Sequence, residues 1–309
     1  MNILHMKYVA EVAECGSINK ASETLLIAPP NLSRCIKELE ADLGIQIFVR
    51  SSRGMTLTPE GETFISYAKN ILRQIDTLES LYQSGEQQKQ HFSVSVPRAS
   101  YISDAFARFS TQLGNSPAEL FYKETNAMRA IRNILMEDYK LGIIRYASHY
   151  DRQFKEMLDE KGFCYETIAE FHYVLVMSKS SPLACKDPVC FKDLEGLIEI
   201  AHGDPYVPSL PLSAARAQEL SDDVQRRICV FERASQFDLL CANPETYMWV
   251  SPIPQALLAR YDLVQKACAD NHKLYKDVLI YQSDYRLSPL DNMFITEVCS
   301  SRRACWPGP

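Results

Sequence analysis

The sequence lacks any apolar run long enough to cross a membrane. Its longest strongly apolar stretch is 171–177, whereas a bilayer-spanning helix needs about 20 apolar residues. The amino terminus has no basic segment followed by an apolar run, because Glu11 and Glu14 interrupt it, so we expect no signal peptide. We therefore expect a cytoplasmic protein with no membrane partner.

Paired cysteines are also missing. None of the ten cysteines has the Cys-x-x-Cys spacing of zinc and redox sites, so we predict no metal site. Most should be small, buried and reduced. A regulatory thiol stays a hypothesis with three candidates, Cys35, Cys299 and Cys305.

The common catalytic and nucleotide-binding motifs are absent. There is no Gly-x-Gly-x-x-Gly, no Gly-x-x-x-x-Gly-Lys-[Ser/Thr], no Gly-x-Ser-x-Gly and no His-Glu-x-x-His. The six histidines are dispersed and show no helical pairing. We therefore expect no catalytic residue, no cofactor and no enzyme activity.

An excess of positive charge is lacking as well. The net charge is −6, and residues 1–90 hold nine Lys or Arg against eleven Asp or Glu. This disfavours indiscriminate nucleic-acid binding. What remains is a local cationic patch of Arg34, Lys37, Arg50 and Arg53.

The strongest local pattern that is present lies in residues 29–43. Leu32, Ile36, Leu39 and Leu43 recur at steps of four, three and four, which predicts an amphipathic helix with one buried side. Two prolines suit its first turn, and Gly44 suits its C-terminal cap. The polar side then presents Asn31, Ser33, Arg34 and Lys37.

The neighbouring segments complete a winged helix-turn-helix. Ser17 can cap a short helix with an apolar stripe of Ile18, Ala21 and Leu25, joined to the next helix by a turn at 26–28. Downstream, the β-forming segments 45–50 and 55–57 flank a polar turn, which predicts a hairpin whose tip carries Arg53. A helix face beside such a wing can enter a major groove and contact flanking phosphates.

Residues 1–61 carry further motifs: Gly16-Ser17-Ile18, Ala21-Ser22, Pro30-Asn31-Leu32-Ser33-Arg34, Leu43-Gly44, Phe48-Val49-Arg50 and Leu57-Thr58-Pro59-Glu60-Gly61. With these motifs the chain resembles the LysR-type transcriptional regulators. The resemblance implies DNA contacts by Pro30, Asn31, Ser33, Arg34, Lys37, Arg50 and Arg53. The family usually has Ser and Gln where this chain has Ala28 and Pro29, so a capping hydroxyl and a base-reading amide are absent.

After the wing, Thr58 can cap and Pro59 can open a long helix. A heptad-like seam along it favours pairing with a second helix, while packing on its own domain is the alternative. The seam consists of Phe64, Ala68, Ile71, Ile75, Leu78 and Tyr82. In the resembling family such a linker helix makes the dimer, and we expect a homodimer and, beyond it, a tetramer. Residues 84–91 are polar and are expected to form a hinge.

From residue 92, strands alternate with helices, which predicts an α/β arrangement with mostly parallel sheets. The resemblance implies a periplasmic-binding-protein-like domain of two subdomains with an effector in the cleft between them. We expect a winged helix-turn-helix at 1–58, a linker at 59–91 and the effector domain at 92–309. Its subdomains should cover 92–163 with 269–302, and 164–268. The tail at 304–309 has no periodicity, so we expect it to be mobile.

Candidate effector contacts lie where predicted strands end, a place that suits ligands in α/β sheets. They are Arg98, Ser100, Tyr101, Thr125, His202 and Gly203. If they converge, a small carboxylate is the natural effector. The alternatives are that Arg98 is a surface charge and that His202 is an ordinary loop histidine.

These patterns favour a regulator that binds double-stranded DNA under control of a small-molecule effector, with RNA polymerase as a further partner. Two other hypotheses stay open: a constitutive architectural DNA-binding protein without a ligand, and an enzyme with a DNA-binding appendage.

Overall fold

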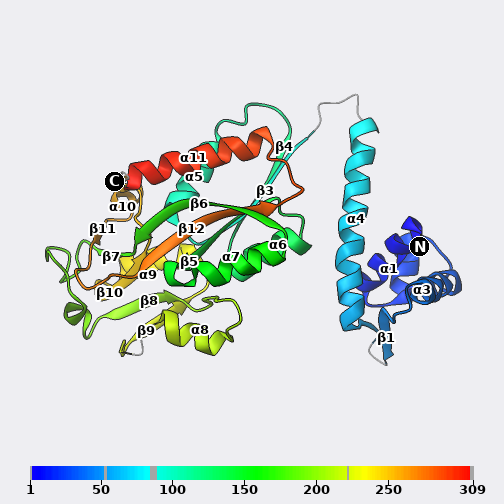
Figure 1. Ribbon diagram of the computed structural model, residues 1–309, viewed down its shortest axis with the longest axis horizontal. Helices are drawn as coiled ribbons and strands as arrows, with labels where there is room; N and C mark the ends of the chain where they lie inside the picture. Colours follow the sequence, from blue (N-terminus) through cyan, green and yellow to red (C-terminus); the bar gives the residue numbers. More distant parts are fainter. Residues whose placement is uncertain (1, 52–53, 84–88, 221–222, 307–309) are drawn as a thin grey trace. The chain divides into compact units, whose positions relative to one another are not determined.

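The computed structural model describes residues 2–51, 54–83, 89–220 and 223–306 (Figure 1). The chain divides into two compact units, one built mainly on Met1–Gln88 and the other on Lys89–Leu135 with Tyr139–Pro309. Among the described helices, none combines the length and the apolar character needed to cross a membrane.

The first unit is a winged helix-turn-helix followed by a long helix. Its elements are α1 (Ile3–Cys15), α2 (Ile18–Leu25), α3 (Pro29–Leu43), β1 (Phe48–Ser51), β2 (Gly54–Leu57) and α4 (Pro59–Gln83). The predicted apolar side of α3 is confirmed, since Leu32, Ile36 and Leu39 are buried in one core with residues of α1 and α4. Gly44 caps α3 in the left-handed conformation, as predicted, and its N–H donates to the Glu40 carbonyl. Ser17 precedes α2, but its hydroxyl makes no capping hydrogen bond.

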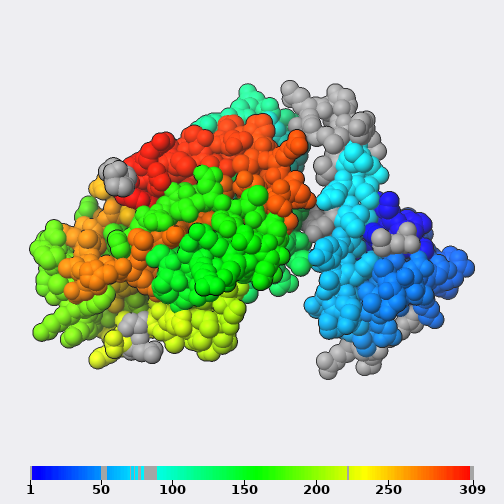
Figure 2. Space-filling model, in the orientation of Figure 1, coloured from blue at the N-terminus to red at the C-terminus, as the bar shows by residue number. Residues whose placement is uncertain are grey.

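Helix α4 is fixed to the rest of this unit near its start. The Thr58 hydroxyl accepts a hydrogen bond from the Gly61 N–H at 2.9 Å, which is the predicted cap. Ala68 and Leu72 are then buried against Met6 and Ala10 of α1. Farther along, the second half of α4 extends beyond α1 and α3 (Figure 1). On the face seen in Figure 2, the helices of this unit cover only the lower part of α4.

The predicted seam of α4 is buried within its own chain at one end and exposed farther along. Ala68 is 1% exposed within its own chain, so it cannot contact a second subunit, and Phe64 is partly buried in the same cluster. The packing alternative is therefore correct for this end of the seam. Ile71 and Leu78 are exposed, at 39% and 54%. The Tyr82 side chain and residues 84–88 of the predicted hinge lie outside the described residues.

The second unit contains two five-stranded sheets. Its strands are β3 (Gln90–Val96), β4 (Ala118–Glu124), β5 (Leu141–Ala147), β6 (Phe163–His172), β7 (Val174–Ser178), β8 (Ile198–His202), β9 (Arg227–Val230), β10 (Thr246–Val250), β11 (Leu263–Lys266) and β12 (Leu274–Gln282). Its helices are α5 (Ser100–Ser110), α6 (Ala127–Met136), η1 (Ser148–Tyr150), α7 (Asp151–Glu160), η2 (Phe191–Leu194), α8 (Leu212–Glu219), α9 (Arg233–Ala242), α10 (Gln255–Arg260) and α11 (Pro289–Cys305). The strand orders are β4-β3-β5-β12-β6 and β11-β7-β10-β8-β9.

Two features of these sheets correct the predictions. Pairs β3–β4, β3–β5, β8–β9 and β8–β10 are parallel, but β12 and β7 pair antiparallel with both of their neighbours, so the sheets are mixed rather than mostly parallel. Strand β6 also belongs to the first sheet, so residues 164–172 lie in the first subdomain and not in the second. The physical reason is that β6 pairs along its length with β12, and the chain changes sheet only at Tyr173.

The expectation of a mobile tail is wrong for its first residues. Helix α11 includes Ala304 and Cys305, and the Trp306 ring meets Tyr101 edge-on at 5.1 Å and Phe171 at 5.5 Å between centroids. Burying an aromatic ring in this way fixes the chain end to the first sheet. Helix α11 also packs on α5, where Arg108 pairs with Glu297 at 3.1 Å. Residues 307–309 lie outside the described part of the chain.

Candidate functional site

The polar face of α3 is the first candidate site. Asn31, Arg34 and Lys37 are exposed, Pro30 is exposed at the start of the helix, and Ser33 is half-buried between them. Arg34 forms an exposed ion pair with Glu38 one turn later, with Nε 3.3 Å from Oε1. Exposed pairs of this kind are weak, so a phosphate or a guanine edge can compete for the guanidinium.

A carboxylate attaches the wing to this helix. Glu40 of α3 accepts hydrogen bonds from the Ile47 N–H at 2.8 Å and the Phe48 N–H at 3.2 Å. The motif Leu39-Glu40 is part of the family resemblance, but the sequence patterns gave Glu40 no role, because its partners are backbone groups outside its helix. Arg53 and the Arg50 side chain lie outside the described residues, although the backbone of Arg50 is part of β1.

The start of α3 offers few hydrogen-bond donors. Ala28 at the cap position makes no side-chain bond, and Pro29 and Pro30 have no backbone N–H. The Asn31 N–H donates to the Ala28 carbonyl at 3.0 Å. Contacts of Ala28, Pro29 and Pro30 with a duplex would therefore be mainly apolar, and the T methyl group is the apolar feature of a major groove, while the Asn31 side chain is the polar group of this turn.

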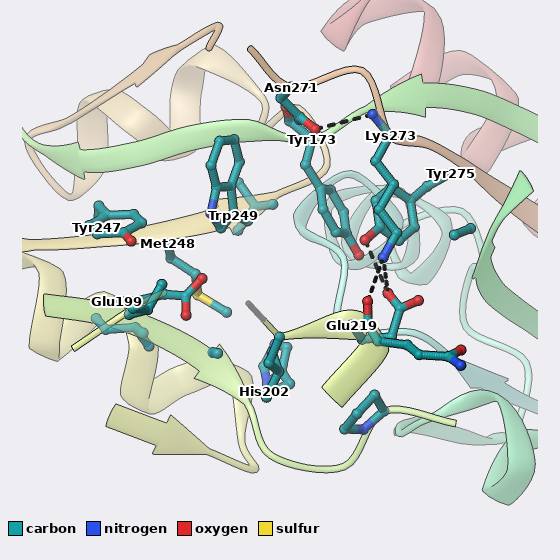
Figure 3. Close-up of a pocket in the computed structure, with 18 of the residues that line it drawn as sticks. Tyr173, Glu199, His202, Glu219, Tyr247, Met248, Trp249, Asn271, Lys273 and Tyr275 are labelled. Atoms are coloured by element: carbon teal, nitrogen blue, oxygen red, sulfur yellow. Dashed lines mark hydrogen bonds and ion pairs between the residues drawn. The ribbon is translucent and has the colours of Figure 1, made fainter. Parts of the chain in front are cut away.

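The second candidate site is a cleft between the two sheets of the second unit, with a volume of about 1370 Å³. This is a generous space for a small molecule. Figure 3 shows side chains from both sheets and from the crossover segments around it. Charged, polar, aromatic and apolar side chains line the cleft. Among them are Arg98, Thr125, Arg145, Tyr173, Lys192, Glu195, Glu199, His202, Asp204, Glu219, Asp223, Met248, Trp249, Asp270, Lys273 and Tyr275.

Only some of the predicted effector residues line this cleft. Arg98, Thr125 and His202 line it, so three of the predicted side chains lie at one cleft, and their contact with an effector stays a prediction. Ser100 and Tyr101 are buried in the first subdomain and do not line it. Gly203 does not line it either, and its carbonyl accepts a hydrogen bond from the Arg216 Nε at 2.8 Å.

The Arg98 guanidinium is held by the chain itself. Its Nη1 and Nη2 lie 2.8 and 3.1 Å from the two Asp204 carboxylate oxygens, and both side chains are nearly buried. Asn126 donates to the same carboxylate at 3.2 Å. Arg98 is therefore neither the surface charge of the alternative reading nor a free cation for an anionic ligand.

Arg145 is held in the same way. Its Nε and Nη2 donate to the Asp277 carboxylate at 2.7 and 2.6 Å, and its guanidinium lies over the Phe171 ring at 4.8 Å from the centroid. The Tyr101 hydroxyl donates to Asp277 as well, at 2.5 Å. Burial and the Asp277 carboxylate raise the pKa of Tyr101 well above its usual value, so this hydroxyl stays a donor.

The segment after β8 crosses to the first sheet. Val207 and Ala215 are buried in the core of the first subdomain, and Asp204 reaches Arg98. At the end of α8, Gln218 accepts a hydrogen bond from the Tyr150 hydroxyl. This segment therefore links the two subdomains along one side of the cleft.

Two polar groups at this end of the cleft are incompletely satisfied. Glu219 Oε2 lies 2.9 Å from the Lys273 Nζ and 3.1 Å from the Tyr275 hydroxyl, but Glu219 Oε1 is buried without a hydrogen-bond partner among the described residues. His202 Nδ1 is also buried without a hydrogen-bond partner among the described residues. Burial, with the nearby Arg98 guanidinium, lowers the pKa of His202 to about 4, so its imidazole is neutral at pH 7.

The thiol hypothesis gains no support at the tail. Burial and the nearby Asp104 carboxylate raise the pKa of Cys305 to about 12, which suppresses the reactive thiolate. All ten cysteines are free thiols.

Comparisons with known proteins agree with this arrangement. Residues 3–62 match the model of the bacterial regulatory helix-turn-helix protein, lysR family. The uncharacterized HTH-type transcriptional regulator YcgK of Bacillus subtilis (strain 168) is 45% identical over 98 residues, which is 31% of this chain and 30% of YcgK. The chain thus spans less than a third of this relative's length in the match.

Solved structures match over nearly the whole chain. CbnR complexed with its target DNA has a TM-score of 0.60 at 18% identity, covering 97% of this chain and 100% of CbnR. Full-length LysG from Corynebacterium glutamicum with bound effector Arg has a TM-score of 0.58 at 14% identity, covering 97% and 98%. These likenesses show that both units have the fold of full-length LysR-type regulators.

Proposed function

We propose that the chain is a sequence-specific DNA-binding transcription regulator of the LysR type, because residues 3–62 match the lysR family of bacterial regulatory helix-turn-helix proteins. Its operator binding is modulated by a small molecule held in the cleft of the second unit. Such a regulator acts in the cytoplasm and influences RNA polymerase rather than catalysing a reaction.

The exposed face of α3 is the observation that carries this proposal. Arg34 and Lys37 lie on it with Asn31, while Leu32, Ile36 and Leu39 fix the opposite side in the core. The first unit has no overall positive charge, so we propose few phosphate contacts and specificity through the groove. Arg50 and Arg53 of the wing add contacts to phosphates or to a narrow minor groove.

We also propose that α4 forms a homodimer, with a tetramer as the larger assembly. The exposed Ile71 and Leu78, with the half-buried Ile75, are its apolar surface. Tyr67 is 61% exposed on the same helix and was missed by the heptad pattern. A dimer sets two recognition helices about one DNA turn apart, or a multiple of it.

The cleft supports the regulatory part of the proposal. LysG holds a bound effector, and the cleft here has space for one. A ligand that binds the closed cleft better than the open one shifts the population toward closure. The subunits then reorient about α4, the spacing of the recognition helices changes, and DNA bending and polymerase access change with it. A constitutive architectural protein would lack such a response, and an enzyme would turn the ligand over.

A selection from fragmented genomic DNA tests the proposal. The purified protein should retain a small set of fragments at moderate salt, and Arg34→Ala should lose them while the protein keeps its oligomeric mass. Arg152→Ala is a matched control, because Arg152 also forms an exposed pair with a Glu one turn later, at 2.7 Å. If no fragment is retained, or if both variants behave alike, α3 is not the DNA interface.

A further inference from the structure

Aromatic rings make up one wall of the cleft. Tyr173, at the crossover from β6 to β7, and Tyr275, near the start of β12, stack with centroids 4.0 Å apart at 27°. Trp249 of β10 faces the same space (Figure 3). The π-faces of such rings attract cations, because the ring quadrupole is negative above and below the plane. The chain's own cations already lie over parts of these faces: the Arg145 guanidinium is 5.7 Å from the Tyr173 centroid, and the Lys273 Nζ is 5.4 Å from the Tyr275 centroid.

A carboxylate lies beside these rings. Figure 3 shows Glu219 next to Tyr275 and Lys273, to which its Oε2 is bonded. Its Oε1 is buried and meets no donor in the described part of the chain. A buried carboxylate oxygen is unfavourable unless it accepts a hydrogen bond. A ligand that brings an N–H donor to this oxygen is therefore favoured over one that brings another acceptor.

The arginines of the cleft cannot easily receive an anion. Arg98 and Arg145 are each held by two hydrogen bonds to a carboxylate, Asp204 and Asp277 respectively. An anionic ligand would have to break one of these nearly buried pairs and leave a buried carboxylate without its partner, which is costly. This geometry disfavours the carboxylate effector expected from the sequence.

The exposed rim of the cleft is acidic. Its charged side chains are Lys192, Glu195, Asp223 and Asp270, so negative charge predominates there. A cleft lined by one sign of charge concentrates ligands of the opposite sign. Rim and interior therefore favour the same kind of ligand.

We propose that the effector is an organic cation, a protonated amine or guanidinium compound. Its charged group donates to Glu219 Oε1 and lies against the Tyr173–Tyr275 pair. Its apolar part lies along Trp249. This proposal rests on the regulator function above and names the ligand class of that cleft.

Probes of different charge test this inference. Full-length protein is titrated by calorimetry with the N–H-bearing cations phenethylamine and agmatine, with neutral phenethyl alcohol and with anionic 3-phenylpropanoate. At least one cation should bind, and more tightly than the neutral and anionic probes. Glu219→Gln should weaken cation binding at least about tenfold, because it removes a charged hydrogen-bond partner.

Glu160→Gln is the control, because Glu160 is exposed at the end of α7 and does not line the cleft. Tyr173→Leu should weaken binding of the same cation, while Tyr173→Phe, which keeps an aromatic ring, should not. A merely structural role of Tyr173 would not give this difference between the two variants. Variants whose second unit unfolds in urea as the wild type does, followed by the fluorescence of Trp249 and Trp306, are folded and count in the comparison.

If the anion binds and the cations do not, or if no cation binds, the inference is wrong. Operator retention by the same preparation leaves the DNA-binding proposal standing in that case. If Glu219→Gln and Glu160→Gln bind a cation equally, Glu219 is not its partner and the inference is wrong in the same way.

Discussion

At the scale of single residues, the functional groups of this chain are mostly restrained by partners far away in sequence. Arg98 and Asp204 are a clear example, as are Arg145 and Asp277. Each arginine by itself suggests a site for an anion. Its ion pair with an aspartate leaves the guanidinium little capacity to bind one. This is why the strand-end pattern located side chains of the cleft but could not show that its arginines are already paired with carboxylates.

His202 should make the stability of the second unit depend on pH. Its pKa is lowered from about 6.5 to about 4, so the unfolded chain binds the proton more tightly. The stabilisation is complete above pH 6.5 and is lost as the pH falls toward 4. At pH 5 the free energy of unfolding of the wild type should be about 2 kcal/mol lower than at neutral pH because of this group.

Urea unfolding followed by tryptophan fluorescence measures this effect, because both tryptophans, Trp249 and Trp306, lie in the second unit. The free energy of unfolding should fall less between pH 7.5 and pH 5 in His202→Asn than in the wild type. His272→Asn, at the exposed rim, should show the same fall as the wild type. An unchanged profile in His202→Asn would exclude His202 as the titrating group.

At the scale of elements, the start of α4 depends on a glycine. A Cβ built on Gly61 would lie 2.1 Å from the Ile47 carbonyl oxygen, a backbone atom that cannot rotate away. Gly61→Ala must therefore separate α4 from the wing strand. We expect a loss of roughly 1–3 kcal/mol, as for other overpacked sites.

Differential scanning calorimetry can follow this change as a lower melting temperature of the first unit, with weaker operator binding. Glu62→Ala, at the exposed neighbouring position of the same helical turn, should cost less than about 0.5 kcal/mol. Equal melting temperatures for the two variants would show that the close approach of Gly61 to Ile47 does not matter.

The exposed part of α4 should control assembly. Ile71→Lys combined with Leu78→Lys places two charges on the proposed dimer surface, where burial without partners is unfavourable. Light scattering after size exclusion should then give a mass near the 35.2 kDa of one chain. Gln153→Lys, an exposed addition of charge on α7, should leave the dimer mass unchanged. A dimer that survives the double change would exclude this surface.

At the scale of the whole molecule, the sequence predicted local elements well and long-range arrangement less well. Helix α3 was predicted over its full range, because two prolines, an apolar period and a glycine cap all act locally. The boundary between strands β6 and β7 could not be predicted, because apolar residues continue through the crossover. Their separation at Tyr173 depends on pairing with β12, which is about 100 residues away.

For the candidate sites too, local features could be predicted and long-range ones could not. The face of α3 could be predicted from periodicity, and the family match adds that this domain is of the lysR type. Glu219, Tyr173, Lys273 and Tyr275 could not be predicted, since they come from separate segments that meet only through the packing of two sheets. Their chemistry becomes apparent only once those segments are placed side by side.

Hydroxyl-radical footprinting on a fragment selected from genomic DNA tests the central claim most directly, since it reports both the protected segments of the sugar-phosphate backbone and the spacing between them. The protein should protect two patches separated by about one helical turn, roughly 10 base pairs, or a multiple of it. Arg34→Ala should lose both patches together. A single patch, or two patches that persist in Arg34→Ala, would contradict a dimer that binds DNA through α3.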